Sequence, residues 1–188
     1  MSSMRYGGPR AEKQRIRLEA RQVSMNLDPV YRAEASRSIA RQVLELPAWQ
    51  KAKTVMAYVS MPEEPDTKAI IREALDKGKT LLLPCCVDRE HMVAVPVTDL
   101  SGLKIGRLGI PEPEPMAEET VIPEPEVILV PCVAATPSGI RLGHGAGYFD
   151  HFLAEHDGMT VCLCFRRLLR ADLPTEDTDV PVDLVITD

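Results

Sequence analysis

The sequence lacks an apolar run long enough to cross a lipid bilayer, which argues against a membrane-spanning helix. Its first 22 residues are polar and basic, so the apolar stretch that a secretory signal needs is also missing. The five cysteines include no C-x-x-C pair, which removes the commonest thiol redox motif. We therefore expect a cytoplasmic protein with reduced, buried and chemically inert thiols.

An excess of positive charge is absent as well. The chain has 22 Lys and Arg against 28 Asp and Glu, a formal net charge of -6. This balance argues against nucleic acid or an anionic membrane as the main partner. The 188 residues, 45% hydrophobic and 27% charged, have an ordinary globular composition. They show no internal repeat and favour one domain over residues 1–188, while the oligomeric state stays unknown.

The first half of the chain alternates between helical and strand patterns. A basic helix is predicted over residues 11–22, and a second begins after Asp28, an N-cap residue, with Pro29 in its first turn. A buried strand over residues 54–60 is followed by a helix capped by Asp66 or Thr67 and ended by Gly78. Another short strand covers residues 80–84. This β-α-β order predicts parallel pairing.

The second half is less regular. Residues 91–97 alternate weakly, and the Pro- and Glu-rich residues 109–126 are interpreted as a surface excursion within the domain. Strands are predicted over residues 127–133, 159–165 and 183–187, with a helix over residues 148–155. The predicted fold class is α/β, a three-layer α/β/α arrangement. It has a mostly parallel, Rossmann-like sheet with helices on both faces, and ligands gather at the carboxyl ends of such strands.

A glycine-rich stretch, "GIRLGHGAGYFDHF", runs from Gly139 to Phe152. It has neither the P-loop spacing nor the G-x-G-x-x-G spacing of dinucleotide-binding proteins. Glycines that reach positive φ let successive N–H groups converge on an anion, and a helix N-terminus favours negative charge. Arg141 adds a fork-shaped phosphate donor, and Asp150 offers an oxygen to Mg²⁺. From spacing alone, phosphate binding and a tight connection needed for packing both remain open.

The stretch "SGIRLGHGAGYFDHFL" resembles the signature of the 5-formyltetrahydrofolate cyclo-ligases, also called methenyltetrahydrofolate synthetases. Four shorter stretches in the same order strengthen the resemblance across nearly the whole chain: "KQRIR", "YVSMPEEPDT", "GIPEP" with "LVP", and "DVPVDLVIT". The signature residues that match are Gly139, Arg141, Leu142, Gly143, Gly145, Gly147, Tyr148, Asp150 and Leu153.

The resemblance implies an ATP- and Mg²⁺-dependent enzyme that converts 5-formyltetrahydrofolate to 5,10-methenyltetrahydrofolate and releases ADP and phosphate. It implies Arg141 and Tyr148 as catalytic residues, Asp150 and Asp179 as Mg²⁺ ligands, with Asp183 a weaker candidate, and a reduced folate as substrate. Val59, Glu64 and Tyr148 are implied to bind that substrate. The residues implied to bind ATP are Lys13, Arg17, Arg141, Gly143, His144, Gly145, Ala146, Gly147 and Tyr148.

Several residues near the implied ligand site depart from the family pattern: Cys132, Ala135, Thr136, His144, Ala146, Phe149 and His151. These departures leave two alternatives open. One is a diverged paralogue that binds nucleotide or folate without turnover. The other is an ATP-dependent enzyme that acts on a different small formyl or amide substrate.

Overall fold

The computed structural model describes residues 8–117 and 120–188. Over these residues a six-stranded sheet has the order β10-β9-β6-β1-β2-β3. Every neighbouring pair is parallel except the antiparallel pair of β2 and β3. The mostly parallel sheet is therefore confirmed. Its strands are β1 (Thr54–Met56), β2 (Thr80–Cys86), β3 (Met92–Val97), β6 (Val127–Val130), β9 (Met159–Leu163) and β10 (Leu184–Ile186).

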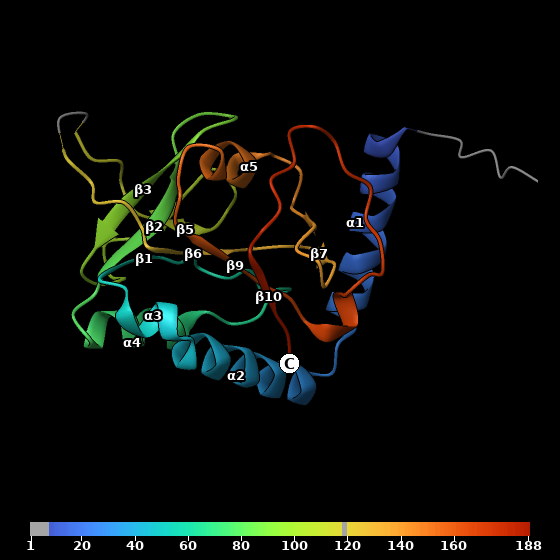
Figure 1. The fold of residues 1–188 in the computed structure, drawn as a ribbon, viewed down its shortest axis with the longest axis horizontal. Coiled ribbons are helices and arrows are strands. Elements are labelled where there is room, and N and C mark those ends of the chain that lie inside the picture. The colour runs from blue at the N-terminus through green and yellow to red at the C-terminus, as the bar shows by residue number, and fades with distance from the viewer. Residues whose placement is uncertain (1–7, 118–119) are drawn as a thin grey trace, which may run out of the picture.

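Helices cover both faces of this sheet, as the predicted three-layer fold requires. Figure 1 shows α2 (Pro29–Glu45), α3 (Pro47–Lys51) and α4 (Lys68–Asp76) on one side and α5 (Tyr148–Leu153) on the other. The first helix, α1 (Pro9–Met25), stands at the right-hand side of that view. None of the helices over the described residues is both long and apolar enough to cross a membrane.

The predicted starts of two helices follow from local hydrogen bonding. The Asp28 carboxylate accepts hydrogen bonds from the backbone N–H groups of Val30 and Tyr31, at 2.8 and 3.2 Å, and caps α2. At α4, the Asp66 carboxylate accepts from the N–H of Lys68 at 2.9 Å. The Thr67 hydroxyl instead donates to the Tyr58 carbonyl at 2.6 Å, which ties the helix start to the chain beyond β1.

That tie explains why β1 is shorter than the predicted strand over residues 54–60. The Ala57 N–H still donates to the Leu82 carbonyl of β2 at 3.0 Å, but from Tyr58 onward the polar groups of the chain bond the start of α4. Besides the Tyr58 carbonyl, the Ser60 N–H bonds the Thr67 hydroxyl at 3.2 Å, and the Ser60 hydroxyl accepts from the Thr67 N–H at 3.2 Å. Likewise β6 ends before Pro131, which has no N–H to give to a neighbouring strand.

Some short elements were not predicted. They are α3, the 3₁₀ turn η1 (Arg166–Leu168), and two antiparallel pairs of two-residue strands. One pair joins β4 (Lys104–Ile105) to β5 (Pro111–Glu112), so the predicted surface excursion carries a strand. The other joins β7 (Ala134–Ala135) to β8 (Arg141–Leu142) and holds Arg141 at the edge of the glycine-rich stretch.

The buried hydrophobic residues form one core cluster that fills the space between the sheet and its helices. Trp49, Phe165 and Ile39 are among the largest fully buried side chains. All five cysteines are free. Four are buried and Cys86 is half-buried, which confirms the prediction of packed, unpaired thiols. The buried thiols are Cys85, Cys132, Cys162 and Cys164.

Candidate active site

A cavity of about 610 Å³ lies at the carboxyl ends of β1, β2 and β6, where the predicted fold places a ligand. Its walls come from α1, the chain after β1, the glycine-rich stretch, α5 and residues 176–179. The structure brings all the residues of the predicted site to this cavity: Lys13, Arg17, Val59, Glu64, Arg141, Gly143, His144, Gly145, Ala146, Gly147, Tyr148, Asp150 and Asp179. The weaker metal candidate Asp183 lies elsewhere and binds Thr160.

The glycines shape one wall of the cavity. Gly145 and Gly147 have φ angles of 109° and 78°, a backbone conformation that residues other than glycine rarely adopt. Gly147 directly precedes α5. A Cβ atom on Gly145 would lie in ordinary contact with Arg17, 3.4 Å from Cζ, so the backbone conformation rather than lack of space requires glycine at this position.

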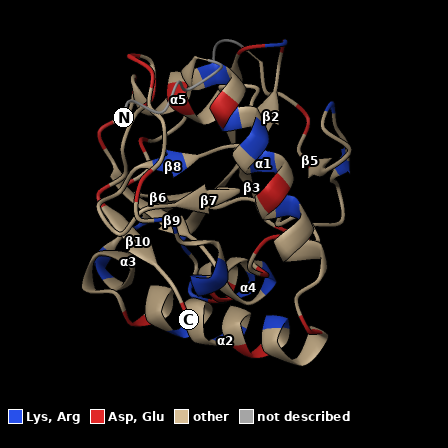
Figure 2. Cartoon of the chain, turned by 90° about the vertical axis from the view of Figure 1, so that its right-hand side faces the viewer, with Lys and Arg blue, Asp and Glu red and all other residues tan. Residues whose placement is uncertain are grey.

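Arg17 and Arg141 flank this glycine wall. Nε of Arg17 donates to the Gly143 carbonyl at 2.8 Å. Nη2 of Arg141 donates to Oδ1 of Asp150 at 2.8 Å, with only 3% of the arginine side chain exposed. In Figure 2 the Lys and Arg residues of α1 are blue, and β8, the strand that contains Arg141, lies in the same half of the molecule as α5. The cationic groups therefore gather where the glycine-rich stretch enters its helix.

Arg141 also has a buried polar atom that lacks a protein partner. Among the described residues, its Nε finds no hydrogen-bond acceptor. A buried donor without a partner costs about 1–3 kcal/mol. An anion bound directly against Arg141 would supply the missing acceptor.

Lys13 is occupied by carboxylates. Its Nζ lies 2.6 Å from Oδ2 of Asp179 and 2.7 Å from Oε2 of Glu176. Burial alone would lower the pKa of Lys13, but the hydrogen bonds to these two carboxylates outweigh it and raise the pKa above its ordinary 10.5. Lys13, predicted to bind phosphate, and Asp179, predicted to bind Mg²⁺, thus form an ion pair with each other.

The two predicted metal ligands do not form a cage by themselves. Asp150 uses Oδ1 to accept from Arg141 at 2.8 Å and from the Val180 N–H at 3.0 Å. Within residues 8–117 and 120–188, no cluster of three or more His, Cys, Asp or Glu side chains is arranged to hold a metal ion. Any divalent ion at Asp150 or Asp179 therefore needs oxygens from a ligand as well.

The other end of the cavity is built around Glu64, which is 6% exposed. Its Oε2 accepts from the Met61 N–H at 2.8 Å, and its Oε1 lies 2.8 Å from Nε2 of His144. His144, predicted among the ATP-binding residues, thus contacts the predicted substrate residue Glu64. The pair joins the glycine-rich stretch to the loop after β1.

Two further residues at this end escaped the sequence analysis. Tyr58 is 3% exposed and lines the cavity, but its hydroxyl has no protein partner among the described residues. Glu112 is 8% exposed, lines the cavity and accepts a hydrogen bond from the Cys86 N–H at 3.0 Å. Tyr58 lies in the family-like stretch "YVSMPEEPDT" and Glu112 in "GIPEP". Membership of these stretches was the one feature of the sequence that could have indicated both residues.

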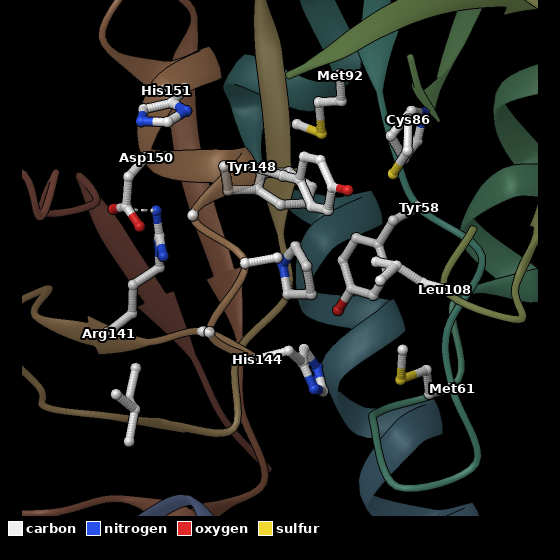
Figure 3. Close-up of a pocket in the computed structure, with 18 of the residues that line it drawn as sticks. Tyr58, Met61, Cys86, Met92, Leu108, Arg141, His144, Tyr148, Asp150 and His151 are labelled. Carbon is white, nitrogen blue, oxygen red and sulfur yellow. Dashed lines mark hydrogen bonds and ion pairs between the residues drawn. The ribbon is translucent and has the colours of Figure 1, made fainter. Parts of the chain in front are cut away.

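Figure 3 shows how the side chains approach this end of the cavity. Tyr58 comes from the chain beyond β1, His144 from the glycine-rich stretch, and Tyr148 from the start of α5. The Tyr148 hydroxyl donates to the Asp88 carbonyl at 2.9 Å, so this ring is fixed at its far end. The half-buried thiol of Cys86 has its pKa raised to about 12, mainly by burial, and stays protonated and unreactive.

Comparison with known proteins places this architecture among folate enzymes. The family model described as "5-formyltetrahydrofolate cyclo-ligase family" matches residues 9–188. A probable 5-formyltetrahydrofolate cyclo-ligase of Schizosaccharomyces pombe is 31% identical over 167 residues, covering 80% of this chain and 82% of the relative. The 5-formyltetrahydrofolate cyclo-ligase of Haemophilus influenzae is 29% identical over 178 residues, covering 91% and 95%.

Solved structures agree with this assignment. The NMR structure of the Aquifex aeolicus 5,10-methenyltetrahydrofolate synthetase superposes with a TM-score of 0.79 at 32% identity, covering 92% of this chain and 88% of the other. A 5,10-methenyltetrahydrofolate synthetase from Mycoplasma pneumoniae has a TM-score of 0.72 at 17% identity, covering 94% and 99%, and supports the fold alone.

Proposed function

The chain belongs to the 5-formyltetrahydrofolate cyclo-ligase family, and we propose that it catalyses the ATP-dependent closure of 5-formyltetrahydrofolate to 5,10-methenyltetrahydrofolate. The observation that carries the proposal is one cavity of about 610 Å³ with two chemically different ends. Arginines and bare glycine backbone line one end, and a buried carboxylate, a histidine and tyrosines line the other. Such a cavity suits a phosphate donor and a heterocyclic acceptor held side by side.

The reaction needs an activated formyl oxygen. That oxygen is a poor leaving group, so it first attacks the γ-phosphorus of ATP and releases ADP. N10 of the folate then attacks the formyl carbon, the carbon–oxygen bond breaks to expel inorganic phosphate, and the N10 proton leaves with that phosphate. Phosphoryl transfer depends mainly on positioning and on stabilising the charge of the phosphate oxygens. The protein therefore needs fixed cations and backbone donors more than an acid–base pair.

The residues at the cationic end fit a phosphate. The buried Nε of Arg141 lacks an acceptor, and Arg17 reaches the same wall through its bond to Gly143. We assign Arg141 to the transferring phosphate, where its fixed charge stabilises the transition state. The backbone at Gly143–Gly147 would lie along the other phosphates. The Tyr148 ring, fixed through its hydroxyl, would separate the phosphates from the folate.

Mg²⁺ also fits this end. Magnesium is commonly held by one or two carboxylates together with substrate phosphates, and Asp150 and Asp179 are two such carboxylates beside the proposed phosphate position. When bound, Mg²⁺ would neutralise charge on the phosphate oxygens. We assign Lys13 to the same phosphates once its carboxylate partners accept the metal.

Glu64 and Val59 would bind the folate at the opposite end, together with the Tyr148 ring. The five free thiols fit a reducing compartment, which supports a cytoplasmic location. The net charge of -6 supports small-molecule ligands over nucleic acid.

The proposal is tested by mixing the protein with Mg²⁺, ATP and 5-formyltetrahydrofolate and following the near-ultraviolet absorbance of the methenyl product. We expect the band to grow only when ATP is present. Arg141→Lys keeps the charge beside Asp150 but loses the planar fork, so we expect slower turnover in a folded protein.

ADP release measured in the same samples separates the alternatives. ATP binding without ADP release or methenyl product would contradict the enzyme and favour a diverged binding protein. ADP release that starts only with another small formyl or amide compound would indicate a different substrate.

A further inference from the structure

We propose that Tyr58 and His144 form a recognition pair for the C4-oxo and N3–H edge of the reduced pterin, and that Glu64, besides its own place against the folate, holds His144 of this pair in position. The inference rests on the proposed function and names the groups that would recognise its substrate. Within the described residues, the Tyr58 hydroxyl and Nδ1 of His144 are two of three buried side-chain polar atoms that lack a hydrogen-bond partner. Both belong to residues that line the cavity.

The two groups lie in the same part of the cavity. Figure 3 shows the Tyr58 hydroxyl and the His144 ring directed into it from opposite elements, one from the chain after β1 and one from the glycine-rich stretch. Glu64 interacts with both: its Oε1 is 2.8 Å from Nε2 of His144, and its negative charge contributes to the raised pKa of the Tyr58 hydroxyl. Burying two unpartnered polar atoms together costs free energy, which a ligand with matching groups would recover.

Tyr58 is a hydrogen-bond donor here. Burial, with a further contribution from the charge of Glu64, raises the pKa of the Tyr58 hydroxyl well above its ordinary 10.0. The phenol therefore keeps its proton and needs an acceptor. A carbonyl oxygen on the ligand is such an acceptor.

His144 is an acceptor at the atom that faces the ligand. A carboxylate can only accept hydrogen bonds, so the contact with Glu64 places a proton on Nε2 of the histidine. Nδ1, the other ring nitrogen, is buried without a protein partner, and in the tautomer with the proton on Nε2 it carries a lone pair that needs a donor. Glu64 is itself fixed by the Met61 N–H on its other oxygen, at 2.8 Å, so the tautomer is set by an anchored group.

A donor beside an acceptor is complementary to a lactam edge, in which a ring carbonyl stands next to a ring N–H. The reduced pterin carries this edge at C4 and N3. Replacing the C4 oxygen by an amino group exchanges donor and acceptor along the edge, so the 4-amino counterpart should be rejected in the same orientation. Sites built to hydrogen-bond a ligand discriminate strongly against the analogue that leaves their polar groups unpaired.

Glu64→Gln tests the tautomer directly. The Met61 N–H still requires an acceptor, so the amide oxygen stays on that side and the amide NH₂ turns to His144. Nε2 then accepts, and Nδ1 carries the proton. This variant keeps the size and burial of Glu64 but reverses the hydrogen-bonding character of the atom that faces the pterin.

The experiment measures by calorimetry the affinities of wild type, Tyr58→Phe and Glu64→Gln for 5-formyltetrahydrofolate and for its 4-amino counterpart, without ATP. We expect wild type to prefer the 4-oxo compound at least tenfold. Tyr58→Phe should weaken binding of the 4-oxo compound about tenfold, and Glu64→Gln should move the preference toward the 4-amino compound. Tyr31→Phe, which removes a hydroxyl bonded to Asp188 outside the cavity, is the matched control and should bind both probes like wild type.

Two readouts distinguish recognition from a general structural role. ATP affinity should be unchanged in Tyr58→Phe. Its melting temperature should equal or exceed that of wild type, because an unpartnered buried hydroxyl is lost. If both variants still prefer the 4-oxo compound, the recognition pair is overturned, but the cyclo-ligase reaction is not. If Tyr58→Phe lowers the ATP affinity, the pair belongs to the nucleotide site. The methenyl assay of the wild-type protein tests the cyclo-ligase reaction separately. If the wild-type protein forms no methenyl product and binds neither folate compound, both the reaction and the recognition pair are overturned.

Discussion

Replacing Arg17 by alanine tests whether ATP phosphates lie on the glycine wall. Arg17 is placed by its own hydrogen bond, because Nε donates to the Gly143 carbonyl at 2.8 Å while the rest of the guanidinium lines the cavity. Burial lowers the pKa of Arg17 from its ordinary 12.5, and three nearby carboxylates oppose that effect. The group stays charged at neutral pH, so its loss removes a cation from the proposed phosphate position.

The size of the effect follows from the burial of the side chain. A hydrogen bond to a charged group contributes about 1.5–3 kcal/mol. Arg17 is only half-buried, and solvent screens part of its charge, so we expect the lower half of this range. A loss of about 1.5–2 kcal/mol corresponds to roughly 10- to 30-fold weaker ATP binding. Water can replace Arg17 on the half-exposed Gly143, so thermal stability should change little.

Calorimetric titration with ATP and Mg²⁺ measures this loss, and Arg15→Ala is the matched control. Arg15 stands on the same helix, is 62% exposed and pairs with surface carboxylates. The control should bind ATP like wild type. Equal affinities in the Arg17→Ala and Arg15→Ala proteins would refute the phosphate assignment. An early thermal transition with normal ATP binding would assign Arg17 to packing.

Three further substitutions test the rest of the cationic end. Gly145→Val places a side chain beside Arg17 at φ 109°, a conformation that costs about 1–3 kcal/mol. We expect this variant to be folded by circular dichroism but not to bind ATP. Gly102→Ala, whose added Cβ meets open space, should bind ATP normally. Asp150→Asn keeps the shape but removes a charge, so turnover should need more Mg²⁺; an unchanged Mg²⁺ dependence would show that the nucleotide alone holds the metal. Lys13→Met removes the cation between two partly exposed carboxylates and should destabilise the fold by about 1.5–3 kcal/mol at pH 8, the usual worth of a hydrogen bond to a charged group. Because the folded-state pKa of Lys13 is raised, this stabilisation is present below pH 10.5 and is lost as pH rises through that pKa, so the unfolding free energies of wild type and variant should converge in strong alkali.

Local chemistry made much of the fold predictable. Asp28 and Pro29 mark the start of α2 because a helix N-terminus needs an acceptor and tolerates proline. The order of strands and helices implied parallel pairing, and parallel pairing implied a ligand at the carboxyl ends of the strands. The motif residues meet at that edge, as expected. Two-residue strands such as β7 and β8 have too few positions to show a period, and for that reason they were missed.

The partners of the site residues were not predictable. Glu64 and His144 are 80 residues apart, and nothing in either local sequence encodes their contact. Lys13 looked like a free phosphate ligand, because a sequence shows charge but not which carboxylate reaches it. The missing partner of the Tyr58 hydroxyl is likewise a property of packing. Residue type predicts what a group is able to bind, whereas tertiary structure decides what is left for a ligand.

The contact between Lys13 and Asp179 spans 166 positions of the chain. Contacts between residues so far apart form slowly, because closing a long loop costs conformational entropy before any bond is gained. We expect the β1–α4–β2 unit, whose contacts are local, to collapse first and the nucleotide end to assemble last. During synthesis a chain would hold a nearly complete sheet before Asp179 reached Lys13. The appearance of ATP binding would then mark the final step of folding.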